Sequence, residues 1–336
     1  WTLVPGGKYY VTRGGSSLIA VSLPRESVSG FQIAASHSDS PTFKVKENGE
    51  ISVDGRYVKL SVEKYGGMIM SSWLDRPLSV AGRLLVEKDK GIESCLFQAN
   101  RDMLLIPSLA IHMNRKINEG YSFNVKKDLQ PLFSMAGEKN LRQVLAETAG
   151  VKTDQIVGSD LFLYNRMKGS IWGAEENFLS SPRLDDLQCA WASLEGFVKG
   201  KGSPERIMVY CVMDNEEVGS GTRQGAGSTF LQDVLERLMI ALGGSREDYL
   251  RAVAKSFLIS ADNAHAVHPN QADKADDNSR PYLNGGPVIK YSANQKYTTD
   301  GSTAAVFGAL CRKVGSPCQV FHNRPDMEGG STLGNI

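Results

Sequence analysis

Two adjacent carboxylates, Glu216 and Glu217, are the residues whose types and spacing most clearly suggest chemistry. They follow an apolar run of strand length, residues 206–213, and precede a stretch with helical periodicity, residues 228–242. A strand that ends in such a turn places both acids at the carboxyl edge of a sheet, where open α/β sheets bind ligands. Neighbouring side chains of a turn point in different directions, so one acid can bind a metal while the other accepts a proton from water. The alternative is a solvated acidic turn, favoured by the dipole of the following helix.

Other ionisable residues also follow expected strands. An alternating segment, residues 31–35, leads to His37 and Asp39, and the apolar segment 256–260 leads to Asp262. A histidine with an aspartate two residues later suits a metal site, because the aspartate can orient the imidazole or a bound water. An ordinary polar strand end is the alternative for each segment taken alone.

Asp185 and Asp186 stand just before a stretch of helical periodicity that continues to Phe197. Ordinary helix capping is the expected role of one of the two. One imidazole and three carboxylates form a donor set that suits divalent ions such as Zn²⁺, Mn²⁺ or Co²⁺, and it differs from the thiolates of a structural zinc site. Three carboxylates also suit two ions, because one carboxylate can bridge ions about 3.5–4 Å apart. The candidate metal ligands are His37, Asp185, Glu217 and Asp262.

Strand and helix patterns alternate on both sides of a middle block in which this alternation is absent. The alternation predicts a doubly wound α/β domain with a mixed sheet, and the middle block predicts an inserted, mainly β domain. We expect the first domain to comprise residues 1–59 and 172–336 and the insert to comprise residues 60–171. The insert contains His112 but no cluster of metal-binding residue types, and its sequence context alone suggests a structural role for that histidine.

Composition excludes several classes of function. The 336 residues carry 38 basic and 37 acidic side chains, so neither a nucleic acid nor a membrane surface is an expected partner. No apolar run approaches the roughly 18 residues that a membrane-spanning helix needs. The five cysteines are scattered without a CxxC pair, which predicts reduced thiols in a cytoplasmic protein. The chain begins at Trp1, so we expect it to be a fragment of a longer protein.

Seven segments, in this order along nearly the whole chain, resemble the aspartyl aminopeptidase family of two-zinc metallo-aminopeptidases. They are His37-Ser38-Asp39-Ser40-Pro41, Trp73-Leu74-Asp75-Arg76, residues 105–112, Arg183-Leu184-Asp185, residues 214–220, residues 260–270 and Gly286-Pro287-Val288-Ile289-Lys290. The resemblance implies a zinc-peptidase fold and the removal of N-terminal Asp or Glu from peptides, with Mn²⁺ or Co²⁺ as possible substitutes for the two Zn²⁺ ions of each subunit.

The resemblance also implies roles for individual residues. Asp185 would bridge the two ions, with His37 and Asp262 on one and Glu217 on the other. Glu216 would be the general base, Asp39 would support His37, and the peptide bond after Asp185 would be cis. The residues matching substrate-contacting positions are His112, His265, Lys290 and Tyr297.

The middle block resembles the family's dimerisation domain, which implies a homo-oligomer built from dimers, by resemblance a tetrahedral dodecamer. His112 would then act across the dimer interface, in place of the structural role suggested above. The family's second zinc site also needs a histidine in a segment after residues 329–334. His322 precedes that motif, so we expect the natural protein to continue beyond Ile336 with a strand and a loop that carry the ligand.

Two alternatives remain open at this point. One is a related two-metal aminopeptidase of different specificity, because several families share the sheet and the metals. The other is a catalytically weak, compartment-forming binding protein that keeps the assembly without the chemistry. The glutamate pair and the four ligands argue against the second alternative, whereas the lack of the expected C-terminal histidine argues for it.

Overall fold

The computed structural model describes residues 1–327, 329–330 and 333, and it divides into two compact units. The first unit comprises Trp1–Asp39 and Arg183–Ile336, and the second comprises Ser40–Pro182. The second unit therefore starts before and ends after the expected residues 60–171, because the strand Thr42–Val53 pairs within its sheet and the hairpin of residues 170–180 lies within the unit. Residues 331, 332 and 334 of the C-terminal motif lie outside the described residues.

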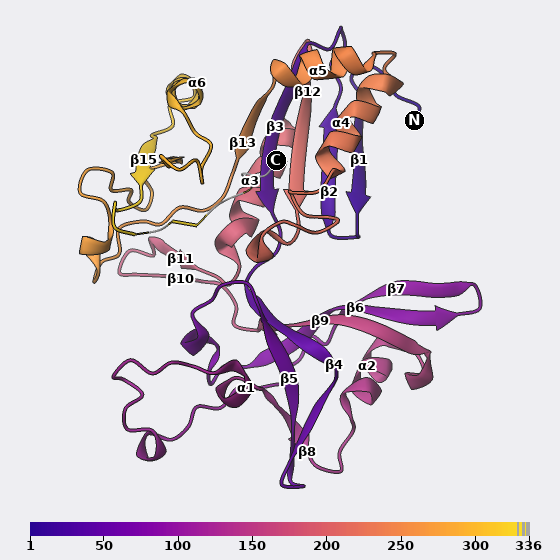
Figure 1. Cartoon of the computed structure of the whole chain (residues 1–336), viewed down its shortest axis with the longest axis vertical. Helices are drawn as coiled ribbons and strands as arrows, with labels where there is room; N and C mark the ends of the chain where they lie inside the picture. Colours follow the sequence, from indigo (N-terminus) through magenta and orange to yellow (C-terminus); the bar gives the residue numbers. More distant parts are fainter. Residues whose placement is uncertain (328, 331–332, 334–336) are drawn as a thin grey trace. The chain divides into compact units, whose positions relative to one another are not determined.

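The first unit is built on a five-stranded mixed sheet (Figure 1). Its strands are β1 (Lys8–Arg13), β2 (Ser17–Ser22), β3 (Gly30–His37), β12 (Arg206–Met213) and β13 (Phe257–Ser260). They lie in the order β1-β2-β12-β3-β13. β1 and β12 are antiparallel to β2, whereas β12 and β13 run parallel to β3. The carboxyl ends of these three parallel strands therefore meet at one edge of the sheet.

Helices cover both faces of this sheet. α4 (Phe230–Ala241) and α5 (Arg246–Ala254) pack on one face, where Phe230 and Val209 belong to the same buried apolar cluster. Tyr210 points to the opposite face, since adjacent strand residues alternate, and its hydroxyl donates to the Ala190 carbonyl of α3 (Leu184–Lys199) at 3.1 Å. The remaining elements are η4 (Glu216–Val218), η5 (Ala272–Lys274), α6 (Gly301–Lys313) and the parallel pair β14 (Val288–Tyr291) and β15 (Gln319–His322).

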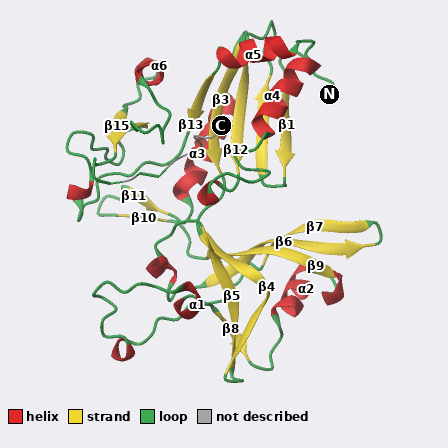
Figure 2. Cartoon of the chain, viewed as in Figure 1, coloured by secondary structure: helices red, strands yellow, loops and turns green. Residues whose placement is uncertain are grey.

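The second unit is mainly strand (Figure 2). Its strands are β4 (Thr42–Val53), β5 (Tyr57–Tyr65), β6 (Leu78–Lys88), β7 (Gly91–Gln98), β8 (Leu132–Met135) and β9 (Ile156–Asn165), in the antiparallel order β7-β6-β9-β4-β5-β8. A separate hairpin joins β10 (Ser170–Trp172) to β11 (Phe178–Ser180). Its short helices are α1 (Val125–Asp128), α2 (Leu141–Ala149), η1 (Met70–Trp73), η2 (Ile111–Met113) and η3 (Thr153–Gln155).

The predicted fold class is confirmed, because a mixed α/β unit is interrupted in sequence by a mainly β unit. Buried apolar side chains form a separate core in each unit. Within the described residues, no helix has the length and apolar character needed to cross a membrane.

Candidate metal and active site

The ionisable residues predicted from the sequence gather at the carboxyl edge of the first unit's sheet. His37 is the last residue of β3, Glu216 and Glu217 lie in η4 just after β12, and Asp262 follows β13. Because these three strands are parallel neighbours, their ends place residues that are far apart in sequence side by side. Asp185 joins them from the start of α3, and the peptide bond that follows it is cis, as the family resemblance implied.

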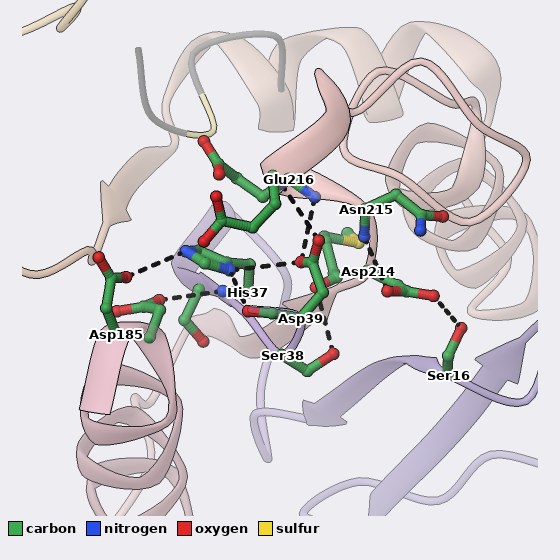
Figure 3. A network of polar contacts seen from close by, with 12 residues as sticks. Ser16, His37, Ser38, Asp39, Asp185, Asp214, Asn215 and Glu216 are labelled. Atoms are coloured by element: carbon green, nitrogen blue, oxygen red, sulfur yellow. Dashed lines mark hydrogen bonds and ion pairs between the residues drawn. The ribbon is translucent and has the colours of Figure 1, made fainter. Parts of the chain in front are cut away.

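The imidazole of His37 is at the centre of this group (Figure 3). Its Nε2 lies 3.4 Å from Asp185 Oδ1, and its Nδ1 lies 3.3 Å from Asp39 Oδ1. His37, Asp185 and Asp262 offer ligand atoms within 4.8 Å of one another, together with Asp186, and His37 does so with Glu216 and Glu217. These distances are compatible with a divalent metal ion after small side-chain adjustments.

Asp39 connects the histidine to the glutamate turn. Its carboxylate accepts hydrogen bonds from the main-chain N–H groups of Glu216 and Glu217, each at 3.1 Å, while it faces the Nδ1 atom of His37. A carboxylate in this position favours the tautomer with a proton on Nδ1, which leaves Nε2 available to bind a metal. The predicted proximity of Asp39 and His37 is thus observed, and the contact with the glutamate turn is an addition that the sequence does not reveal.

Asp186 makes a contact that the sequence does not reveal. Its side chain is buried and Oδ2 accepts a hydrogen bond from the main-chain N–H of His37 at 3.0 Å. Asp185 and Asp186 both have non-helical backbone angles, so the regular part of α3 begins after them. The contact depends on the approach of α3 to the end of β3, a tertiary arrangement that leaves no local pattern in the sequence.

Burial and crowding of like charges raise the pKa values of the acids. Burial raises the pKa of Glu217 to about 7, and the charge of Glu216 contributes further. Burial also raises the pKa of Asp186 to about 6, and it raises the pKa values of Glu216 and Asp262. A cluster that disfavours its own negative charge is one that a divalent cation would stabilise.

The histidine responds to the same excess of carboxylates. Burial alone lowers the pKa of His37, but hydrogen bonds to Asp185 and Asp39 outweigh it and raise the pKa to about 11. A proton on the imidazole therefore partly balances the acids around it. The donor set of one imidazole and several carboxylates fits zinc, which would take over this role of compensating charge.

A cavity of about 200 Å³ opens beside these groups. His265, Lys290 and Tyr297, predicted from the resemblance, line it, as do Asn263 and Phe321, which the sequence analysis missed. The Lys290 ammonium lies 2.8 Å from the Asn263 carbonyl oxygen, 3.6 Å from Asp262 Oδ2 and 5.5 Å from the centroid of the Tyr297 ring. The rings of Phe321 and Tyr297 meet edge to face with their centroids 6.5 Å apart. The pairing of β14 with β15 places Phe321 next to Lys290, and no local motif in the sequence indicates this position.

Two other histidines belong to different surroundings. His322 stacks on Tyr291 and its Nδ1 lies 2.9 Å from Ser279 Oγ, outside the residues that line the cavity. His112 is exposed in η2 of the second unit.

Comparison with known proteins identifies the family. The Aminopeptidase I zinc metalloprotease (M18) family matches residues 1–336. The chain belongs to this M18 family. A probable M18 family aminopeptidase 2 of Clostridium acetobutylicum is 46% identical over 345 residues, which cover 100% of this chain and 79% of the relative. A protein of the same name from Pseudomonas aeruginosa is 41% identical, with the same coverage. The family-level prediction of a zinc aminopeptidase is therefore confirmed.

Solved structures show the same M18 fold. A chain in the cryo-electron microscopy structure of the Ape4 and Nbr1 complex has a TM-score of 0.93 and 35% identity, covering 98% of this chain and 68% of the other. A chain of the Saccharomyces cerevisiae mApe1 dodecamer has a TM-score of 0.82 and 29% identity, covering 94% of this chain and 74% of the other.

Proposed function

We propose that this M18 protein removes N-terminal Asp or Glu residues from peptides in a two-zinc site, with Glu216 as the general base. The observation that carries the proposal is the shared cavity, where His37, Asp185 and Asp262 lie with Glu216 and Glu217. His37, Asp185 and Asp262 would hold one ion, and Asp185 with Glu217 would contribute to the other. Bound zinc would polarise the peptide carbonyl and make a water molecule more acidic.

The protein's own groups would carry the proton and orient the substrate. Glu216 would accept a proton from water and return it to the leaving amine, because burial raises the pKa of its carboxyl towards the range useful in general acid–base catalysis. Asp39 would fix the position of the His37 imidazole relative to the main chain of Glu216, because its carboxylate contacts both.

Selectivity for acidic residues is assigned to Lys290, whose side chain is 14% exposed within the cavity. A substrate carboxylate that enters a closed pocket loses its hydration, which is tolerable only beside a fixed positive charge. His265 and Tyr297 would contribute the remaining contacts to the substrate.

A zinc-reconstituted sample tests the function directly. With peptides that differ only in an N-terminal Asp, Glu, Ala or Leu, we expect release of the free amino acid, with Asp and Glu preferred. A chelator should abolish release and zinc should restore it. Equal rates for the four peptides would favour the aminopeptidase of different specificity, whereas no release from any peptide, with zinc bound, would favour the binding protein.

We also propose a homo-oligomer in which the second unit forms the dimer interface and His112 reaches a neighbouring site. The apolar neighbours of His112 support this, since Leu109, Ile111 and Met113 are 58%, 49% and 70% exposed. The dodecamer of the mApe1 structure is the assembly expected by analogy. A purely monomeric protein in sedimentation velocity would contradict this proposal.

A further inference from the structure

The turn that carries the two glutamates is held by contacts from the distant β1–β2 hairpin. We infer that Asp214 is a positioning residue for Glu216, with its carboxylate fixed by Ser16 so that the turn presents the general base in one orientation. This inference rests on the proposed function, because the contacts of Asp214 matter for catalysis only if Glu216 is the general base.

Asp214 is attached to the β1–β2 hairpin by two hydrogen bonds. The β2–β12 pairing ends at Val212↔Leu18, and its register continues so that Asp214 faces Ser16. Ser16 Oγ donates to Asp214 Oδ2 at 2.6 Å (Figure 3). The next serine, Ser17, is fully buried, and its Oγ accepts a hydrogen bond from the Asp214 main-chain N–H at 2.9 Å. Two successive serines therefore hold both the side chain and the main chain of Asp214.

Asp214 is also bonded to Asn215, the residue at which the turn begins. The other carboxylate oxygen, Oδ1, accepts a hydrogen bond from the main-chain N–H of Asn215 at 2.8 Å. Asn215 has φ 65° and ψ 25°, a left-handed conformation that is uncommon for residues with a side chain but that asparagine adopts more readily than most. Thr222 Oγ1 donates to Asn215 Oδ1 at 2.8 Å, which fixes the same residue from the far side of the turn. The direction in which the chain enters Glu216 is thus set by Asn215 together with Asp214 and Thr222.

The two glutamates are held by contacts on both sides of the turn. Asp39 accepts from the main-chain N–H groups of Glu216 and Glu217 on one side, while Asp214 holds the residue before them on the other. A catalytic group must lie within about 0.5 Å of its productive position, and a displacement of about 1 Å can cost roughly 10²-fold in rate. Loss of the Asp214 carboxylate would remove its bonds to Ser16 and to the Asn215 N–H and leave the Asp39 contacts in place, so the cost should fall on turnover.

The test compares Asp214→Ala, Asp214→Asn and Ser16→Ala with the wild-type protein loaded with zinc. We expect Asp214→Ala to lower kcat at least about tenfold, with KM and zinc content within about twofold of wild type. Asp214→Asn should recover most of the loss, because its Oδ1 can still accept from Asn215 and its amide can bond to the Ser16 hydroxyl. Ser16→Ala should lower kcat about threefold. Ser29→Ala, which removes a hydroxyl bonded to the Glu205 carbonyl at 3.0 Å at the opposite end of β3, should leave kcat unchanged.

A second readout does not depend on activity. Amide hydrogen exchange at Glu216 and Glu217 should be at least about tenfold faster in Asp214→Ala than in wild type. Unchanged exchange together with unchanged kcat, or a fall in zinc content equal to the fall in kcat, would overturn the inference. If Asp214→Ala does not fold, Ser16→Ala decides by the same measurements. A wild-type protein without activity would contradict the proposed function, and the exchange measurement would then judge the inference alone.

Discussion

Replacing Glu216 with glutamine should lower kcat at least about 10²-fold, the usual scale for the loss of a general base, while zinc stays bound. The amide has nearly the same shape as the carboxylate but cannot accept the proton from water. The main-chain N–H of residue 216 keeps its bond to Asp39, so the turn should keep its position. Steady-state kinetics together with zinc content by mass spectrometry measure both parts of this prediction.

Glu217→Ala is the matched variant, because it changes the neighbouring acid in the same short helix. It removes a proposed ligand, so we expect less bound zinc as well as lower activity. Both glutamates lie within metal-binding reach of His37, so the division of labour depends on this comparison. If Glu216→Gln loses zinc and Glu217→Ala retains it, the roles are reversed.

Replacing Lys290 with methionine should lower kcat/KM for Asp and Glu substrates about 10- to 100-fold more than for Leu or Ala substrates. A hydrogen bond to a charged group contributes about 1.5–3 kcal/mol, which corresponds to that range of selectivity. Methionine keeps much of the length of the side chain and removes its charge. The measurement is kcat/KM for the four substrates with the same leaving group.

Lys290 also lies near Asp262, so its loss can weaken the metal site for every substrate. The ratio of acidic to neutral substrates separates the two effects. Lys199→Met, which changes a lysine that is 76% exposed on α3, is the control and should leave all four values unchanged. An equal loss across the four substrates would show that Lys290 supports the metal site and does not select the substrate.

The parts of the site that the sequence predicted are those set by local patterns. His37, Glu216 and Asp262 each follow an apolar strand segment, and parallel strands that share a sheet bring such ends together. The positions of the strand ends were therefore sufficient to predict that these residues lie in one site, even though the order of the strands was not known.

The parts that were missed depend on contacts between distant segments. Asp186 was one of two aspartates expected at a helix start, and its bond to the main chain of His37, 149 positions away, was not predicted. Ser16 and Asp214 are 198 positions apart, and only the β2–β12 register brings them together. The limits of the insert depend on long-range pairing in the same way, because no local pattern shows that β4 pairs with β9 and β5 with β8.

We propose that His37, Asp185, Glu217 and Asp262 hold zinc beside Glu216. Anomalous diffraction at the zinc absorption edge, from crystals of the zinc-loaded protein, tests it most directly. We expect one peak about 2.0–2.2 Å from His37 Nε2 and from carboxylate oxygens of Asp185 and Asp262. We expect a second peak about 2.0–2.2 Å from carboxylate oxygens of Asp185 and Glu217. Glu216 should remain outside bonding distance of both. A zinc ion bound by Glu216, or no zinc in this cavity, would show that these residues do not have the proposed roles.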